Sequence, residues 1–396
     1  MVAISPQGAP HAVRSLTGRR LWDFFVLGGA SILLWPLFVV LQVDAPVLDG
    51  TDESPAATTL IAMLLLINYP HFMSSYKLGY GRGLPYVRAR WPQLLVVPVI
   101  LVILIFAGFA LRDLKPGDVL LVRALDGLLA FIGASTRFAE YPTFGAVSLA
   151  LLLHTMFLTV GWHYAKQTFG AMMVVGNYDG FRLALWQRRA LRIHLLSVWW
   201  LNFVLLNEGT TTTSNYGFHL GMLGLPSLLV PLAWTIFVVT ALIMAAALVT
   251  ATRENGRPPG LLYLTPLVAL WVWFVPLIDP RAFLIYVPTF HSLQYLAFIF
   301  RVESRRRQLH PPRSPPLSAV IFVGGLVLMG WISFMSGPRA LDTWFDSLEL
   351  VGGQYFFIAI TTAINIHHYF IDNVIWRFDD REVQGLLLHP PRSGSA

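Results

Sequence analysis

Long apolar stretches are the feature that most restricts what this chain can fold into. Windows of about 20 apolar residues, the length of helix that crosses a bilayer, recur about ten times along the 396 residues. Only 12% of the residues are charged, whereas water-soluble chains carry about a quarter. Within lipid every backbone polar group needs an internal partner, so runs of this length are expected to be helical. The sequence therefore predicts an all-α fold, a polytopic integral membrane bundle.

We expect a single membrane domain over residues 23–380 with about ten transmembrane helices. A cytoplasmic N-terminal segment, 1–22, precedes it, and a mostly disordered tail, 381–396, follows it. No small-residue cleavage site follows the first apolar run, which is therefore expected to stay as an uncleaved span. Residues 120–134 could add an interfacial or re-entrant piece. The expected spans lie near 24–43, 56–76, 91–112, 143–165, 191–207, 227–251, 261–278, 283–300, 317–335 and 350–372.

Basic residues alternate between the loops and predict the orientation. Every second loop is basic, and Lys and Arg concentrate in cytoplasmic loops. Ten spans with both termini in the cytoplasm satisfy this bias, and we expect a bacterial inner membrane location. The net charge of +7 comes from these clusters and does not indicate nucleic-acid binding. The clusters follow the second, fourth, sixth and eighth spans and include Lys77, Arg82, Arg88, Arg90, Arg182, Arg188, Arg189, Arg192, Arg253, Arg257, Arg301, Arg305, Arg306, Arg307 and Arg313.

The sequence contains no cysteine, which excludes disulfides, thiolate catalysis and iron–sulfur clusters. Any bound metal must be held by histidine, carboxylate or carbonyl groups. Hardly any Asp or Glu lies within the expected spans apart from Asp372, so a carboxylate-bridged di-iron centre is not expected. Imidazole suits iron, copper and zinc, which leaves an all-His or nearly all-His site as the remaining possibility.

Histidines on four of the even-numbered spans fall at similar depth. Each precedes a cytoplasmic basic residue by a separation of about 5 to 15 Å along a helix, so four helices can bring imidazoles to one layer. A lone histidine in a span more often makes an interhelical hydrogen bond than a metal bond, but several in one layer favour metal. The histidines in this layer are His71, His163, His291 and the adjacent pair His367 and His368. Those we place elsewhere are His154, His194 and His219.

Polar residues at helical spacing indicate which faces look inward. In the last expected span Thr361, Asn365, His368 and Asp372 lie on one face. Hydrocarbon cannot hydrogen-bond such a face, so it must point into the bundle. Asp372 could then accept an N–H from a metal-bound imidazole.

Four histidine segments resemble those of the Brp/Blh-like membrane carotenoid oxygenase family. The segments are "NYPHFMSSY", "GWHYAKQTFG", "TFHSLQYLAF" and "NIHHYFIDNVIW", in the same order along the chain, and they cover about 40 residues. The family pattern has a second histidine one turn after "HS", where this chain has Tyr295. This tyrosine could be a ligand or could orient one. Spacing to the aspartate favours His367 as the family's last histidine, whereas the polar face favours His368.

The resemblance implies a metal-dependent oxidoreductase with a non-haem Fe(II) centre that activates dioxygen to split a conjugated double bond; copper and zinc remain alternatives. The substrate would be an apolar, lipid-like or polyene molecule entering from the bilayer. The metal-ligand candidates are His71, His163, His291, His367 and His368, and the candidate catalytic residues are Tyr295 and Asp372.

Three other functions compete with an oxygenase. A transporter or channel could use the same histidines to relay protons or ions. A membrane lipid desaturase or hydroxylase would hold two irons, but its usual HxxHH box is missing because Ile364 stands where the first histidine would fall. An acyltransferase with one buried histidine as base is a further possibility.

Overall fold

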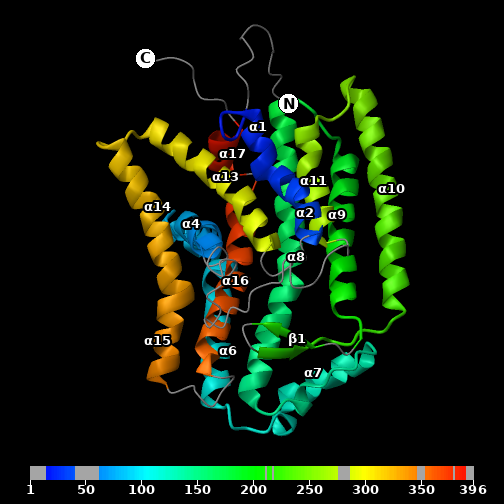
Figure 1. Cartoon of the computed structure of the whole chain (residues 1–396), viewed down its shortest axis with the longest axis vertical. Helices are drawn as coiled ribbons and strands as arrows, with labels where there is room; N and C mark the ends of the chain where they lie inside the picture. The colour runs from blue at the N-terminus through cyan, green and yellow to red at the C-terminus, as the bar shows by residue number, and fades with distance from the viewer. Residues whose placement is uncertain are drawn as a thin grey trace.

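A computed structural model describes residues 15–40, 62–209, 212–215, 218–274, 286–345, 353–377 and 380–388. These residues form a bundle of helices, most of which run between the end that holds α1 and α17 and the opposite end (Figure 1). The all-α prediction is confirmed, with one short two-stranded hairpin as an addition. It pairs β1 (Thr212–Asn215) with β2 (Phe218–Gly221) in antiparallel fashion.

The first part of the chain forms α1 (Arg20–Phe24), η1 (Phe25–Gly29), α2 (Ala30–Val40), η2 (Leu64–Asn68), α4 (Tyr69–Tyr80), α5 (Leu84–Ala89), η3 (Pro92–Val96), α6 (Val97–Ala110), η4 (Pro116–Asp118), α7 (Leu120–Phe131), η5 (Phe138–Glu140), α8 (Phe144–Asp179) and α9 (Leu185–Leu206). After the hairpin come α10 (Leu229–Asn255), α11 (Leu261–Phe274), α13 (Tyr286–Leu309), α14 (Pro315–Trp331), η6 (Ile332–Ser336), α15 (Gly337–Trp344), α16 (Tyr355–Ile375) and α17 (Arg381–Leu387).

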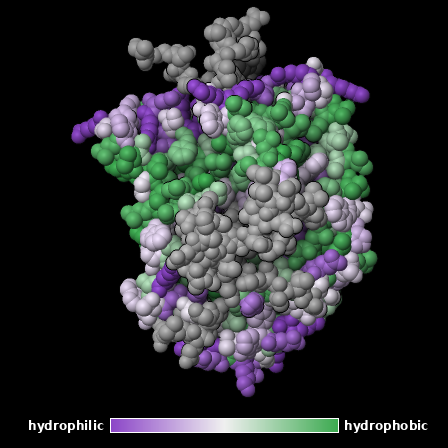
Figure 2. Space-filling model, viewed as in Figure 1, coloured by the Kyte–Doolittle hydropathy of each residue, from purple (hydrophilic) through white to green (hydrophobic). Residues whose placement is uncertain are grey.

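Five helices among the described residues are long and apolar enough to cross a membrane. They expose large apolar side chains such as Ile103, Leu242 and Ile321, each more than 60% accessible, as lipid-facing surfaces do. Figure 2 shows apolar surface below a hydrophilic rim at the end that holds the termini. The five segments are Pro92–Ala110, Phe144–Asp179, Leu185–Leu206, Leu229–Asn255 and Pro315–Trp344.

The remaining expected spans correspond to helices that are broken, short or polar. The first is interrupted at Gly28, whose φ of 131° is open to glycine but rarely to other residues, and the seventh is the short helix α11. The second, eighth and tenth contain the polar residues of the histidine layer. Parts of these spans, including 41–61 and 275–285, lie outside the described residues.

Two peripheral helices bear on the expected boundaries. Helix α7 lies across the base of the bundle in Figure 1 and exposes Leu120 and Phe131, as an interfacial helix would. The tail expected to be disordered from residue 381 begins instead with α17, whose Val383 and Leu387 are buried in the main apolar core. The C-terminal apolar residues therefore find a packing partner that the polar tail composition did not reveal.

Helix α16 is the central element of the bundle. It packs against α8, α4 and α6, and nearly all of its residues are buried. Helix α8 continues the packing to α9 and α11, and α9 pairs with α10 on the outside. Polar side chains on α16 therefore face other helices rather than lipid, as the expected polar face requires.

Candidate metal centre

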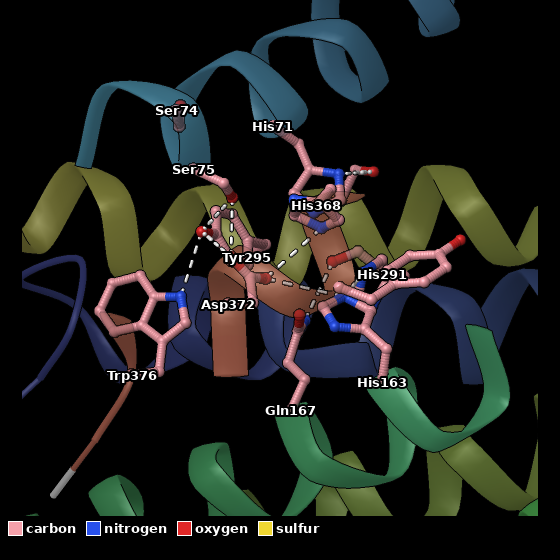
Figure 3. A network of polar contacts seen from close by, with 12 residues as sticks. His71, Ser74, Ser75, His163, Gln167, His291, Tyr295, His368, Asp372 and Trp376 are labelled. Carbon is pink, nitrogen blue, oxygen red and sulfur yellow. Dashed lines mark hydrogen bonds and ion pairs between the residues drawn. The ribbon is translucent and has the colours of Figure 1, made fainter. Parts of the chain in front are cut away.

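Four buried histidines from four helices meet at one point. His71 comes from α4, His163 from α8, His291 from α13 and His368 from α16 (Figure 3). One ring nitrogen from each lies within 4.8 Å of the others, and each side chain is at most 4% exposed. Residues separated by almost 300 positions in sequence are thus held in one small volume.

The spacing of the ring nitrogens suits a metal ion. His163 Nε2 and His291 Nε2 are 3.1 Å apart. Metal–nitrogen bonds of about 2.1 Å at tetrahedral or octahedral angles place neighbouring ligand atoms about 3.0 to 3.4 Å apart. The His163–His291 pair therefore has the spacing of two ligands of one ion, and one nitrogen of each other ring lies within 4.8 Å of this pair.

Several nitrogens in the cluster have no hydrogen-bond partner among the described residues. They are His71 Nε2, His291 Nδ1 and both ring nitrogens of His368. A buried polar atom without a partner costs about 1–3 kcal/mol, and native structures contain few of them. Since each of the four rings brings one nitrogen to a shared volume, and three of the rings carry a nitrogen without a partner among the described residues, the donor set fits an ion that imidazole binds, such as iron, copper or zinc.

A hydrogen-bonded chain fixes the tautomer of His71. Ser292 Oγ donates its only proton to Asn68 Oδ1 over 2.7 Å and lies 2.9 Å from His71 Nδ1. With its proton committed, the Ser292 oxygen can only accept, so His71 Nδ1 must carry a hydrogen. The lone pair of His71 then resides on Nε2, the unpartnered nitrogen. Ser292 thereby prepares His71 for metal binding.

Asp372 turns one carboxylate oxygen towards the cluster. Its Oδ1 accepts hydrogen bonds from Ser75 Oγ and Tyr295 Oη, both at 2.8 Å. Its Oδ2 has no hydrogen-bond partner and lies 3.4 Å from His368 Nε2 and 3.8 Å from His163 Nε2. The free oxygen can accept a proton from an imidazole or bind the ion directly.

Tyr295 orients Asp372. Its hydroxyl donates to Asp372 Oδ1, accepts the Trp376 indole N–H at 3.1 Å and lies 2.5 Å from Ser75 Oγ. The sequence left open whether Tyr295 is a ligand or orients one. Its hydrogen bond to Asp372 matches an orienting role.

The structure separates the two adjacent histidines of α16. His368 lies in the cluster, whereas His367 has Nδ1 3.0 Å from Tyr76 Oη and Nε2 3.3 Å from Tyr80 Oη. Adjacent positions on a helix point about 100° apart, so only one of the pair can face the centre. His367 is therefore not brought together with the other metal-ligand candidates.

Local sequence explains how α4 presents His71. Pro70 has no N–H to donate, and the π-helical turn η2 directly precedes the helix that carries it. Such wider turns rotate the following residues relative to a regular helix and are frequent at functional sites.

Several partners of the cluster were not predicted from the sequence. Ser292 follows His291 directly. The ring of Tyr164 is tilted against His291 with centroids 3.9 Å apart, and Tyr369 stacks on His163 at 4.7 Å. Gln167 donates to the backbone carbonyl of His291. Serine and tyrosine are common in such helices, so their types alone carried no signal.

Two cavities adjoin the cluster on different sides. The larger, about 640 Å³, is lined by His163, Tyr295 and Asp372 among others. The smaller, about 80 Å³, is lined by His71 and His291. The larger falls within the range of sites for drug-sized ligands, and the smaller does not.

Comparison with known proteins identifies no relative of this chain. No family model, curated protein or solved structure matches the chain.

Proposed function

We propose that the chain is a membrane-embedded non-haem iron oxygenase that acts on an apolar, lipid-like or polyene substrate. The observation that carries the proposal is the gathering of four imidazoles, with unpartnered nitrogens, beside a cavity large enough for a substrate. Histidines that only join helices would have their nitrogens hydrogen-bonded to neighbours.

His71, His163, His291 and His368 would hold the ion, which would supply dioxygen activation. Four neutral imidazoles leave coordination positions for further ligands and neutralise none of the charge of a divalent ion. Asp372 provides a nearby carboxyl oxygen that can accept a proton or bind the ion, and Ser75 and Tyr295 keep this group in position. The surrounding buried aromatic side chains exclude water, which protects reactive species from side reactions.

The resemblance of the four histidine segments to carotenoid-cleaving membrane oxygenases supports the reaction type. In such a cleavage the carbon–carbon double bond breaks and each carbon receives one atom of dioxygen, so two carbonyl groups form without an external reductant. The ten-span topology, the cytoplasmic termini and the bacterial inner membrane location are part of the same proposal. They are supported by the alternating basic loops and by the hydrophilic rim beside the termini (Figure 2).

The deciding experiment measures metal content and oxygen consumption on purified protein. We expect close to one iron per chain, its loss in a His163→Ala variant, and oxygen consumption only when a polyene such as β-carotene is added. Two irons per chain would indicate a desaturase or hydroxylase. Stoichiometric copper or zinc would show that the site holds that metal instead of iron. No stoichiometric metal, together with proton or ion flux in vesicles that survives chelation, would replace the proposal with a transporter.

A further inference from the structure

The larger cavity has an amphipathic lining. It lies between α8, α9, α13, α16 and α17 and has apolar walls formed by side chains such as Phe169, Leu195 and Phe298. Its volume of about 640 Å³ suits a ligand with a substantial apolar body. Three basic residues interrupt these apolar walls: Lys166 on α8, Arg192 on α9 and Arg377 after α16.

Two of these basic residues, Lys166 and Arg192, contact neutral groups of the chain. Among the described residues neither Lys166 nor Arg192 forms an ion pair with a carboxylate. Lys166 donates instead to the amide oxygen of Asn373 and lies 4.5 Å from the Trp162 ring centroid. Arg192 lies over the ring of Phe169 at 4.7 Å.

The charges of these residues act on one another. Lys166, Arg192 and Arg377 bring like charges into one cavity, where they repel one another, and Asp372 is the acidic residue among the described residues that line it. Asp372 already accepts two hydrogen bonds and turns its remaining oxygen towards the histidines. An anion in the cavity would relieve this repulsion, and the arginine fork is suited to carboxylate and phosphate oxygens.

We propose that the larger cavity binds an amphiphile with an oxyanion head, a carboxylate or phosphate, held by Lys166 and Arg192, and with an apolar chain along the aromatic and aliphatic walls. Lys166 follows His163 by one helical turn, about 4.5 Å along the axis of α8, so the bound molecule is presented to the histidine cluster. That this molecule is the substrate rests on the proposed oxygenase function. The binding itself does not.

The test is equilibrium binding to the full chain purified in neutral maltoside micelles. Four probes are compared. Radiolabelled oleate has both the anionic head and the apolar chain, and dioleoyl phosphatidate is a bilayer lipid that has both. Oleyl alcohol has the same chain without the charge, and inorganic phosphate has the charge without a chain. We expect oleate or phosphatidate to bind at least tenfold more tightly than either oleyl alcohol or phosphate, because hydrogen bonds to charged groups are the stronger ones. Preference for oleate identifies a free acid as the ligand, and preference for phosphatidate identifies a bilayer lipid. Equal binding of oleyl alcohol overturns the proposal.

Variants locate the binding. Arg192→Gln should weaken binding of the preferred anion at least tenfold, and Arg192→Lys should restore most of it. The matched control is Arg189→Gln, since Arg189 is an exposed arginine on the same helix that does not line the cavity. Unchanged binding in Arg192→Gln, or equal loss in Arg189→Gln, contradicts the assignment.

Iron is measured on the same samples so that the two proposals can fail separately. Protein that binds iron but neither anion refutes the ligand class and leaves the oxygenase proposal standing. Protein that binds the anion but no iron refutes the oxygenase proposal and leaves the cavity assignment standing.

Discussion

Two groups of buried histidine in this bundle are equally hidden but differently bonded. His194 on α9 is fully buried, and both of its ring nitrogens are used: Nδ1 lies 3.1 Å from Thr240 Oγ1, and Nε2 accepts the Trp271 indole N–H at 3.0 Å. In the four-histidine cluster, His71 keeps one nitrogen unpartnered and His368 keeps two. Burial alone therefore does not distinguish a joining histidine from a candidate ligand. What distinguishes the cluster is the convergence of four rings together with nitrogens that lack a partner among the described residues, whereas His154, whose Nε2 also lacks one, lies outside it.

The largest expected effect is loss of the metal when one cluster ligand is removed. If the proposed centre holds iron, His291→Ala should lower iron affinity more than 100-fold, because it would remove a direct ligand, a larger loss than the 10–100-fold typical of an outer partner. His194→Ala should leave the iron content unchanged. The measurement is metal per chain by mass spectrometry after equilibration with Fe(II), and equal loss in both variants would erase the distinction between the two groups.

Removal of the carboxyl group beside the cluster should have the next largest effect. Asp372→Asn should weaken iron binding about 10–100-fold, because it removes a carboxyl oxygen that lies 3.4 Å from His368 Nε2 and 3.8 Å from His163 Nε2. Asp342→Asn is the matched control, since Asp342 is buried and both of its oxygens accept backbone N–H groups of Phe356 and Phe357. Competition with a chelator of known affinity gives both values, and a retained affinity in Asp372→Asn would exclude an electrostatic role.

The tautomer argument predicts a smaller effect. Ser292→Ala removes the hydroxyl that directs the proton to His71 Nδ1 and should weaken iron binding about tenfold. Ser197→Ala, which removes a hydroxyl bonded to Thr240 beside His194, should not alter it. The same chelator competition measures the iron affinity of both variants. A reduced affinity in Ser197→Ala alone would contradict the role given to Ser292.

For stability we expect the reverse ranking: replacing His194 should cost more than replacing a histidine of the cluster. In metal-free protein His194→Leu should lower the free energy of unfolding by about 1–3 kcal/mol, because Trp271 and Thr240 lose a partner. His368→Leu should cost less than this, since neither of its nitrogens has a hydrogen bond to lose. Thermal unfolding in detergent, with metal removed by chelation, compares the two variants; a larger loss for His368 would show that its nitrogens are paired.

The smallest effect is expected at the neighbour of His368. His367→Gln should leave iron binding unchanged, because His367 contacts Tyr76 and Tyr80 rather than the cluster. If His367→Gln loses iron and His368→Gln keeps it, His367 and not His368 is the ligand.

The sequence predicted the helical class and the layer of histidines because both depend on local pattern. Apolar length fixes helices in lipid, and the spacing of Thr361, Asn365, His368 and Asp372 fixes one face of α16. The choice between His367 and His368 could not be made, since it depends on the rotation of α16 against α4 and α8. The partnership of Ser292 with Asn68 joins segments more than 200 residues apart and leaves no trace in either segment. The number of spans stays a prediction, since five of the described helices are long and apolar enough to cross a membrane and the helices at the other expected spans are short, broken or polar.

The position of the cluster between two unequal cavities has a consequence for how reactants would meet. His163 and Asp372 border the large space, while His71 and His291 border one of about 80 Å³, with room for a diatomic gas or a few waters. An ion held by all four rings would lie beside both cavities. A long organic molecule could approach it from the larger cavity and a small molecule from the smaller one. Each could then arrive by its own route, in either order, without having to pass the other.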